Sequence, residues 1–538
     1  MNTLLSITDL SVRLPANADR PYALRQVSLD LRENEILCVV GESGSGKSMT
    51  ASAIMGLLPE QTRIESGSIL LEDRDLLSLP ESALRKIRGA RIGMIFQEPM
   101  TALNPLHTVA DQIGEMFRTH RPTLSRKAIA EKVQRLLIDV QIPDPLSAAH
   151  AYPHQLSGGQ RQRVMIAMAL ALEPRVLIAD EPTTALDVTT QAQILRLIRE
   201  LQQRQGTSVL FITHDFGVVA DIADRVAVMQ HGEVVEQGPA EQILNAPRHP
   251  YTQALIAAVP SFRPGASRPA VASQDILTLE HVSKTFRQGG WLPRNRRVSH
   301  ALRDVSLTLP QGSTLGIVGE SGSGKSTLAR CIVRLYQPDS GEITLADQRH
   351  DGSNRTRQRR QSRTVQMVFQ DPFASLNPRQ TVGEIVGKGL EIHGASRKQA
   401  QQKARELFSL VGLDPESIHR YPHEFSGGQR QRIGLARALA LEPRILVADE
   451  PVSALDVSVQ AQVLRLLAEL RQRLGLSLIF ITHDLRVAAQ ICDRVIVMKA
   501  GEIVEQGPTH QVFQSPRHEY TQLLLNAIPG KGWNLQTP

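Results

Sequence analysis

The sequence predicts an α/β protein built from two similar domains, and three observations support this prediction. The chain of 538 residues repeats itself: residues 152–187 and 421–456 match without gaps at 26 of 36 positions. Each half of the chain alternates short apolar runs with stretches of helical periodicity, which is typical of a mostly parallel sheet covered by helices. In each copy, one apolar run also leads into a glycine-rich loop. The offset of 269 residues is too long for a solenoid repeat, so we expect duplication of a whole domain.

The composition excludes several classes of protein. Hydrophobic residues make up 41% and charged residues 21% of the chain, so a disordered protein is not expected. The longest apolar run, residues 164–172, is half as long as a membrane-spanning helix. The first 14 residues lack the pattern of a secretory signal. We therefore expect neither an integral membrane protein nor a secreted one. The net charge of +7 is mild for this length and does not by itself indicate a partner.

The repeat sets the expected domain limits. We predict a first domain over residues 1–260, a linker over 261–275, a second domain over 276–529 and a tail over 530–538. The linker is rich in Pro, Ser and Ala and has no apolar periodicity, which indicates an exposed connection.

The same elements are expected in the same order in both domains. They are an early strand (4–14, 276–286), a strand before the glycine-rich loop (35–42, 313–320), a helix after that loop, a mainly helical stretch (97–157, 370–426), and two more apolar strands (175–181 and 208–215; 444–450 and 477–484). This order of strands and helices is typical of an α/β sheet. The glycine-rich loop then follows one strand of the sheet, and the acidic and Thr-His-Asp residues lie at the ends of others.

The glycine-rich loops both satisfy the pattern G-x-x-x-x-G-K-[ST] between a predicted strand and a predicted helix. Glycine lets successive backbone N–H groups turn around a di- or triphosphate, the helix N-terminus adds positive charge, and the lysine reaches the phosphates. One copy could be a glycine-rich turn with a surface lysine, but two copies at the repeat offset argue against that alternative. The predicted nucleotide ligands are Gly41, Glu42, Ser43, Gly44, Ser45, Gly46, Lys47 and Ser48, and Gly319, Glu320, Ser321, Gly322, Ser323, Gly324, Lys325 and Ser326.

Acidic pairs follow a later apolar strand in each domain. Asp180 and Asp449 are expected at the carboxyl edge of the sheet, where they can hold Mg²⁺ together with Ser48 and Ser326. The next residues, Glu181 and Glu450, are placed to act as general bases on an attacking water. Such a pair alone is more often a turn or a helix cap, but the upstream loop favours a site.

The order of motifs resembles that of ABC-type ATPases: phosphate loop, LSGGQ or FSGGQ, apolar-Asp-Glu, ALD, and a strand that ends in Thr-His-Asp. The resemblance covers both halves and implies two tandem ABC-type P-loop ATPase domains. Each would have a mostly parallel sheet core, an antiparallel β subdomain and a helical subdomain. In this family the signature contacts nucleotide held by the opposite domain, which implies Lys47 facing Ser426 and Lys325 facing Ser157. The implied signature ligands are Ser157, Gly158, Gly159 and Gln160, and Ser426, Gly427, Gly428 and Gln429.

Other roles are implied by the same resemblance, position by position. They are metal contact for Gln97 and Gln370, a hydrogen bond to the γ-phosphate for His214 and His483, coupling of the two sites for Asp187 and Asp456, and adenine stacking for Tyr22. His300 occupies the place of Tyr22 in the second half, which puts stacking there in question.

The sequences after Gln97 and Gln370 contain an LNP pattern, and the halves close with RHPYTQALIAAVP (248–260) and RHEYTQLLLNAIP (517–529). These segments resemble the oligopeptide/dipeptide/nickel branch of ABC importers, and the fused arrangement resembles Yej-type peptide/microcin C or glutathione-type ATPases. The resemblance implies ATP hydrolysis with Mg²⁺ that energises import of peptides or peptide-like solutes. It also implies two permease subunits, a periplasmic solute-binding protein reached through them, and a place on the cytoplasmic face of the bacterial inner membrane. Many relatives carry a four-cysteine cluster, but the three cysteines here are far apart, so no iron–sulfur cluster is expected.

Two alternatives stay open from the sequence. Tandem ABC proteins that act on ribosomes typically have a long charged helical linker, unlike the short Pro-rich one here. Sugar-importer ATPases with fused halves usually carry a degraded second site, and this one is intact. The Arg-rich segments 287–300 and 349–363 are typical of solvated loops or of a surface near phospholipid. Nucleic acid is not an expected partner, because only Trp291 offers a stacking aromatic ring there.

Overall fold

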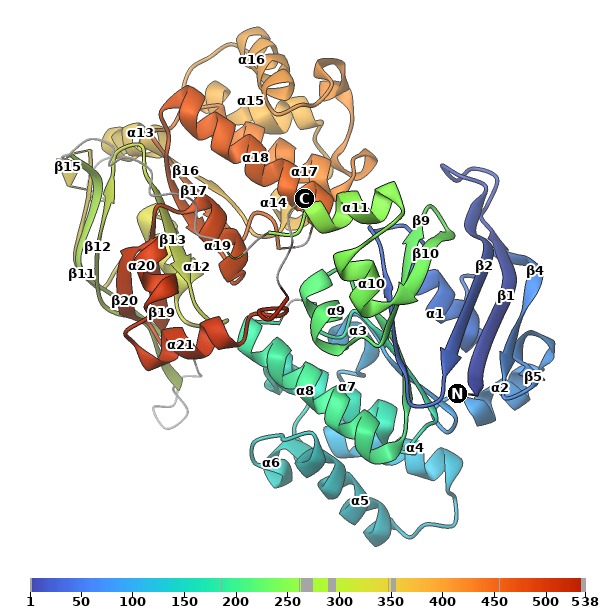
Figure 1. Ribbon diagram of the computed structural model, residues 1–538. Coiled ribbons are helices and arrows are strands. Elements are labelled where there is room, and N and C mark those ends of the chain that lie inside the picture. The colour runs from blue at the N-terminus through green and yellow to red at the C-terminus, as the bar shows by residue number, and fades with distance from the viewer. Residues whose placement is uncertain are drawn as a thin grey trace. The chain divides into compact units, whose positions relative to one another are not determined.

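The fold is taken from a computed structural model, which describes residues 2–184, 186–260, 262, 274–288, 297–346, 348–349, 355–453 and 455–533 (Figure 1). The chain divides into two compact units. Unit 1 comprises Met1–Leu186, Thr190–Val259 and Pro529–Pro538, and unit 2 comprises Asp187–Thr189 and Pro260–Ile528. Most of the predicted linker, and parts of both Arg-rich segments, lie outside the described residues.

Unit 1 is built on two sheets. The six-stranded sheet has the order β10-β9-β3-β8-β7-β6, in which β10 is antiparallel to β9 and the other neighbours are parallel. The second sheet is antiparallel, with the order β2-β1-β4-β5. The strands are β1 (Thr3–Arg13), β2 (Tyr22–Arg32), β3 (Ile36–Val40), β4 (Arg63–Leu71), β5 (Arg74–Asp75), β6 (Ile92–Ile95), β7 (Val176–Asp180), β8 (Ser208–Ile212), β9 (Arg225–Gln230) and β10 (Glu233–Pro239). Every residue of β3, β7 and β8 is buried, as expected for parallel strands with both faces covered.

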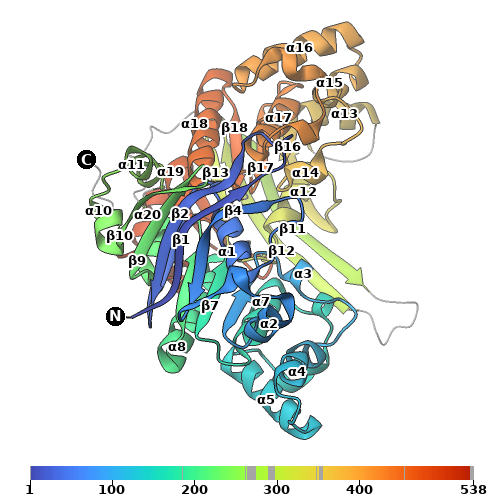
Figure 2. The same cartoon turned by 90° about the vertical axis from the view of Figure 1, so that its right-hand side faces the viewer.

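Unit 1 has helices that pack on its mainly parallel sheet and helices in the stretch after Gln97 that pack on one another. They are α1 (Lys47–Met55), α2 (Glu81–Ile87), α3 (Pro99–Ala102), α4 (Val109–His120), α5 (Arg126–Asp139), α6 (Pro145–His150), α7 (Gly158–Leu170), α8 (Val188–Gln205), α9 (Phe216–Ile222), α10 (Ala240–Asn245) and α11 (Pro250–Ala257). The helical stretch predicted between Gln97 and Ser157 contains α3 to α6, and Figures 1 and 2 show α4 and α5 beside α7. Side-chain caps fix where these helices begin: Thr108 accepts from the N–H of Asp111, and Ser125 accepts from that of Ala128, both at 3.2 Å.

Unit 2 repeats this plan. Its sheets have the orders β12-β11-β14-β15 and β16-β17-β18-β13-β19-β20. The strands are β11 (Asp275–Gln288), β12 (Arg297–Pro310), β13 (Thr314–Val318), β14 (Ser340–Leu345), β15 (Gln348–Arg349), β16 (Val365–Val368), β17 (Ile445–Asp449), β18 (Ser477–Ile481), β19 (Arg494–Lys499) and β20 (Glu502–Pro508). The helices are α12 (Lys325–Ile332), α13 (Arg355–Thr364), α14 (Pro372–Ser375), α15 (Val382–Ile392), α16 (Arg397–Leu410), α17 (Gly427–Leu439), α18 (Val457–Leu474), α19 (Leu485–Ile491), α20 (Thr509–Gln514) and α21 (Glu519–Asn526). The two sheets and the helical part in each unit confirm the predicted α/β fold class.

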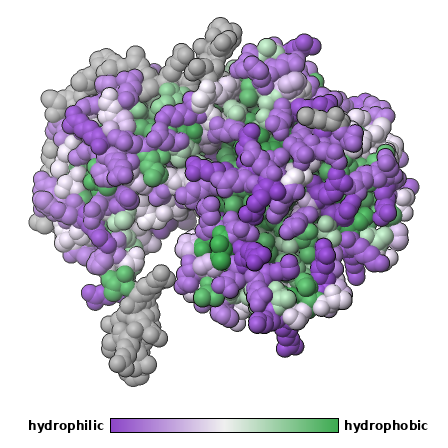
Figure 3. Space-filling view, turned by 60° about the horizontal axis from the view of Figure 1, so that its bottom comes forward, coloured by the Kyte–Doolittle hydropathy of each residue, from purple (hydrophilic) through white to green (hydrophobic). Residues whose placement is uncertain are grey.

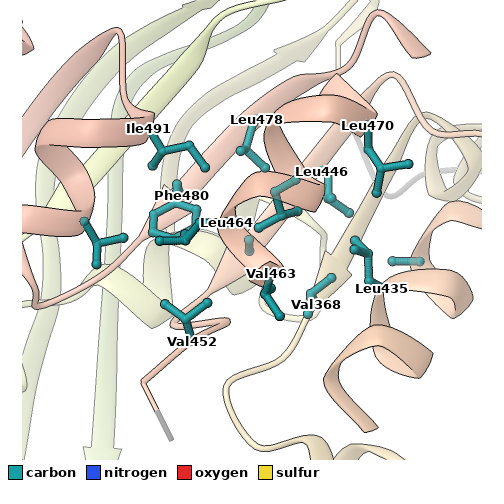
Figure 4. Packing of buried hydrophobic residues seen from close by; sticks show 14 of the residues in the cluster. Val368, Leu435, Leu446, Val452, Val463, Leu464, Leu470, Leu478, Phe480 and Ile491 are labelled. Atoms are coloured by element: carbon teal, nitrogen blue, oxygen red, sulfur yellow. The ribbon is translucent and has the colours of Figure 1, made fainter. Parts of the chain in front are cut away.

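The core of unit 2 holds β17 and β18 in place. Figure 4 shows Leu446 of β17, with Leu478 and Phe480 of β18, packed against side chains of α17, α18 and α19. Leu446, Leu478 and Phe480 are 1%, 2% and 0% exposed, and burial of such a side chain contributes about 1.5–3 kcal/mol. The packing fixes two strands whose carboxyl ends carry Asp449 and the Thr-His-Asp sequence.

The face of the protein drawn in Figure 3 is mainly polar. Figure 3 shows a face on which hydrophilic side chains predominate and hydrophobic ones are scattered. Among the described residues, no helix combines the length and apolar character that crossing a bilayer requires.

Phe480→Ala tests the packing under β18. Phe480 is fully buried, so we expect the substitution to lower the free energy of unfolding by about 3–5 kcal/mol. Leu474→Ala is the control, because Leu474 is 48% exposed and its truncation should change stability by less than about 1 kcal/mol. Hydrogen exchange of β17 and β18 in the full chain measures the effect. Equal exchange rates in the two variants would contradict this account of the core.

Candidate nucleotide sites

The phosphate loop of unit 1 closes around its own lysine. Nζ of Lys47 donates to the carbonyl oxygens of Gly41 at 2.7 Å and Glu42 at 2.9 Å, and the side chain is buried. Gly41 has φ of 154°, and a Cβ there would lie 2.3 Å from the carbonyl oxygen of Met229. Only glycine therefore fits at the point where β3 enters the loop. The ammonium group lies inside a ring of backbone atoms at the N-terminus of α1, which is an arrangement that suits phosphate oxygens.

The loop of unit 2 has the same geometry. Nζ of Lys325 donates to Gly319 at 2.8 Å and Glu320 at 2.7 Å, and burial lowers the pKa of Lys325. A cavity of about 570 Å³ lies over this loop. Its lining includes Lys325, Ser326 and Glu450, together with Phe286, Val298 and His300 of the antiparallel sheet. The cavity therefore offers both polar and apolar walls to a nucleotide.

The predicted metal ligands meet beside each loop. Oγ of Ser48 donates to Oδ1 of Asp180 at 3.1 Å, and Oγ of Ser326 donates to Asp449 at 3.2 Å. Burial raises the pKa of Asp180 to about 6, helped by the adjacent carboxylate of Glu181, whereas the hydrogen bond from Ser48 lowers it. At neutral pH Asp180 is therefore mostly ionised. A hydroxyl and a carboxylate at this spacing are the oxygen ligands that Mg²⁺ takes in proteins.

The carboxylate of Glu181 is held by three side chains. Nε2 of Gln97 donates to it at 3.1 Å, Oγ1 of Thr184 donates at 2.9 Å, and Nδ1 of His214 lies 3.3 Å away. Burial alone would raise the pKa of Glu181, but the hydrogen bond and charge of His214 outweigh it and hold the pKa at about 2. The carboxylate is therefore ionised throughout the physiological range, as a general base must be.

Glu450 has a similar setting in unit 2. Gln370 donates to its carboxylate at 3.0 Å, and Nδ1 of His483 lies 3.2 Å away. Burial opposes ionisation, yet His483 holds the pKa of Glu450 below its usual range. Ser453 occupies the position of Thr184, but its hydroxyl donates to the backbone oxygen of Glu450 at 3.1 Å. The second carboxylate therefore lacks the Thr184-type hydrogen bond.

Both glutamates have an unusual backbone conformation. Glu181 has φ of 45° and Glu450 has φ of 46°, in the left-handed region that is costly for a residue with a side chain. The N–H of Glu181 donates to the carbonyl of Ile212 at 3.0 Å, so the turn stays tied to the end of β8. In both copies the side chain of this residue accepts a hydrogen bond from Gln97 or Gln370.

The signature sequences form the N-termini of α7 and α17. Ser157 caps α7 by accepting from the N–H of Gln160 at 3.3 Å, and Oε1 of Gln160 accepts from the N–H of Ser157 at 2.9 Å. Ser426 and Gln429 form the same capping box. Gln160 and Gln429 thus use their side-chain oxygens within the helix end, and the N–H groups of the glycines next to each cap lie at the positive end of the helix.

The remaining predicted residues are placed as follows. Tyr22 is the first residue of β2, and a hydrogen bond with Glu65 raises its pKa. His300 lies 3.2 Å from the hydroxyl of Thr285 and lines the cavity of unit 2. Asp187 and Asp456 directly precede α8 and α18.

Two kinds of contact were not predicted from the sequence. One is the hydrogen bond of Thr184 to Glu181. A threonine three residues after the glutamate that follows the strand could have indicated this bond. The other is made by Tyr251 and Tyr520, whose hydroxyls accept hydrogen bonds from the phosphate loops at 3.2 and 3.1 Å. The sequence contains the pattern Arg-His-x-Tyr-Thr in both halves, but it does not indicate that the tyrosine contacts the phosphate loop.

Comparison with known proteins identifies the family. The model for ABC transporters matches residues 24–184 and 302–453, more than half of the chain. The chain belongs to the ABC transporter family. A second model, the C-terminal region of oligopeptide/dipeptide transporters, matches residues 235–288 and 504–536 of this ABC protein.

Known ABC proteins match nearly the whole chain or about one half of it. The glutathione import ATP-binding protein GsiA of Salmonella paratyphi A is 48% identical over 98% of this chain and 89% of that protein. The GsiA of Escherichia coli K12 is 46% identical with the same coverage. A solved structure of the ATP-binding cassette MJ0796 with ADP and Pi is 30% identical, with a TM-score of 0.40, over 44% of this chain and 98% of that chain.

The family matches confirm the central predictions from the sequence. The chain is an ATPase with two ABC domains and is the ATP-binding subunit of a peptide-type ABC transporter. It therefore works with membrane permease subunits and is associated with the membrane at its periphery. The comparisons support neither the ribosomal nor the sugar-transport alternative.

Thr184→Val tests the setting of Glu181. The substitution keeps the shape of the side chain but removes one of the hydrogen bonds to a buried carboxylate. Such a bond contributes about 1.5–3 kcal/mol, of which the remaining partners recover a part, so we expect the rate of ATP hydrolysis at the first site to fall about 3- to 30-fold. Ser453→Ala is the matched control and should change the rate less, because Ser453 bonds the backbone instead. A larger loss of ATPase rate in Ser453→Ala than in Thr184→Val would show that the hydrogen bond to the carboxylate does not determine the rate.

Proposed function

We propose that the chain hydrolyses ATP in both halves to drive the import of a peptide or peptide-like solute of the glutathione class. The observation that carries the proposal is the intact chemistry of both copies. Each phosphate loop, metal-binding pair and ionised glutamate is present and in contact with its partners. The oligopeptide/dipeptide region in both halves and the glutathione import name of the relatives support the class of solute.

The residues divide the work as follows. Lys47 and Lys325, with the backbone N–H groups of their loops, bind the β- and γ-phosphates and orient the nucleotide. Mg²⁺ would be held by Ser48, Asp180 and Gln97 in one unit and by Ser326, Asp449 and Gln370 in the other, and it would neutralise phosphate charge. The donor set fits this ion, since the hydroxyl and carboxylate of each pair already lie within 3.2 Å of each other.

Glu181 and Glu450 polarise the attacking water, and His214 and His483 orient them. The low pKa of each glutamate keeps it ready to accept a hydrogen bond from water. Nδ1 of each histidine lies 3.2–3.3 Å from the glutamate carboxylate, and the ring would also hydrogen-bond the γ-phosphate. Most of the rate enhancement comes from positioning and from stabilisation of charge on the departing phosphate.

The transporter is completed by other proteins. We propose two permease subunits, contacted through the segments after Gln97 and Gln370, and a periplasmic binding protein that delivers the solute. This assembly places the chain on the cytoplasmic face of the bacterial inner membrane. ATP binding and the permeases would then act on the same two-state element, which is the requirement for coupling hydrolysis to transport.

Glu181→Gln and Glu450→Gln test the two sites separately. Each change removes the base but keeps the size of the side chain, so we expect similar residual ATPase rates in the two single variants. In the double variant the rate should fall about 10²- to 10⁴-fold. Glu200→Gln, at an exposed position of α8, should leave the rate unchanged. Strongly unequal single variants would show that only one half hydrolyses ATP in the cycle.

Purification of the tagged chain from its native cells in mild detergent tests the transport function. We expect two polytopic membrane proteins to copurify, and proteoliposomes of that complex with the binding protein should take up labelled glutathione or a short peptide only with ATP. Copurification of ribosomal proteins without permeases would contradict the proposal. Uptake of sugars instead of peptides would overturn the assigned class of solute.

A further inference from the structure

A tyrosine near the end of each half contacts the phosphate loop of the same half. Tyr251, in α11, accepts a hydrogen bond on its hydroxyl oxygen from the N–H of Glu42 at 3.2 Å. Tyr520, in α21, accepts from the N–H of Glu320 at 3.1 Å. Both tyrosines lie in the region that matches oligopeptide/dipeptide transporters. The repeated contact therefore links that region to the nucleotide site.

The contacted peptide unit also binds the lysine of the phosphate loop. The N–H of Glu42 and the C=O of Gly41 belong to one peptide group, and that C=O accepts from Nζ of Lys47 at 2.7 Å. In unit 2, the C=O of Gly319 accepts from Nζ of Lys325 at 2.8 Å. A chain of two hydrogen bonds thus runs from the tyrosine hydroxyl through one peptide to the lysine. Hydrogen bonds in such a chain polarise one another, so the tyrosine fixes and strengthens the acceptor of the lysine.

The segment that carries Tyr251 is anchored to the sheet. The carboxylate of Glu236, in β10, accepts from the N–H groups of Arg248 at 2.7 Å and His249 at 3.1 Å. Nδ1 of His249 then accepts from the N–H of Tyr251 at 3.2 Å, which sets the start of α11. The strand neighbours β10 and β9 place this anchor next to β3 and its loop.

Unit 2 repeats the anchor. Glu505 accepts from the N–H groups of Arg517 at 2.8 Å and His518 at 3.1 Å, and His518 accepts from the N–H of Tyr520 at 3.1 Å. Nζ of Lys499 also lies 4.7 Å from the centre of the Tyr520 ring, where the first half has Gln230. Burial raises the pKa of the Tyr520 hydroxyl, so it remains protonated near neutral pH.

We propose that Tyr251 and Tyr520 are positioning residues for nucleotide binding: each hydroxyl holds the first peptide of its phosphate loop so that the loop and its lysine are set for the phosphates. The inference rests on the nucleotide sites described above and deepens their assignment, because it gives the C-terminal region of each half a role in ATP affinity. A tyrosine that only fastened the C-terminal helix would affect stability and leave ATP affinity alone.

Tyr251→Phe in a Lys325→Ala chain tests the first half, and Tyr520→Phe in a Lys47→Ala chain tests the second. Removing the hydroxyl takes away the acceptor that Tyr251 or Tyr520 offers to the loop N–H, so we expect the Kd of ATP to rise about 3- to 10-fold in each. In the otherwise wild-type chain, KM for ATP should rise by a similar factor and kcat should change less than twofold. The melting temperature, followed in the same samples, should shift by only a few degrees.

Gln253→Ala is the matched control, because it weakens the attachment of α11 without touching the phosphate loop. Nε2 of Gln253 donates to the carbonyl oxygen of Pro247 at 3.0 Å and has no path to the loop, so its variant should bind ATP as the parent chain does. Unchanged ATP affinity in Tyr251→Phe and Tyr520→Phe would overturn the proposal. Equal loss of affinity in Gln253→Ala and Tyr251→Phe would also overturn it, because the effect would then follow from a loosened helix. ATP binding by the parent chains reports separately on the nucleotide sites themselves.

Discussion

The chemistry of each unit depends on the parallel pairing of four neighbouring strands. In unit 1 these are β6, β7, β8 and β3, and in unit 2 they are β16, β17, β18 and β13. Parallel strands end at one edge, so the phosphate loop, the Asp-Glu pair, the histidine and the glutamine all emerge within hydrogen-bonding distance. A slip of one residue in β7 would turn Asp180 to the opposite face and separate it from Ser48. Such a slip would also refit every side chain of a strand that is buried on both faces, and close packing opposes that change.

Duplication has preserved the phosphate chemistry while the surroundings have changed. The distances from the lysines, serines and glutamines to their partners agree within about 0.2 Å between the halves. The differences lie one step away from the phosphates, where Thr184 is replaced by Ser453 and Gln230 by Lys499. The two sites are therefore expected to share a mechanism and to differ in how firmly the glutamate and the loop are held.

The phosphate loops and the Asp-Glu pairs could be predicted from the sequence because backbone geometry restricts their residue types. No other residue fits at Gly41, because a Cβ there would lie 2.3 Å from the carbonyl oxygen of Met229, and the acids directly follow an apolar strand. The hairpin of β9 and β10 was missed, although its His231-Gly232 turn, with φ of 51° and 87°, follows a known pattern. The contact of Tyr251 could not be predicted, because it joins residues 209 positions apart and depends on the order of β10, β9 and β3.

The central claim is that both halves contain a complete nucleotide site. Isothermal titration of the Glu181→Gln/Glu450→Gln chain with ATP and Mg²⁺ tests it most directly, because binding is measured without turnover. The account predicts two ATP molecules bound per chain, falling to one when either Lys47 or Lys325 is also replaced by alanine. A single ATP per chain before either lysine is changed would show that one of the two sites does not bind nucleotide and would contradict the account.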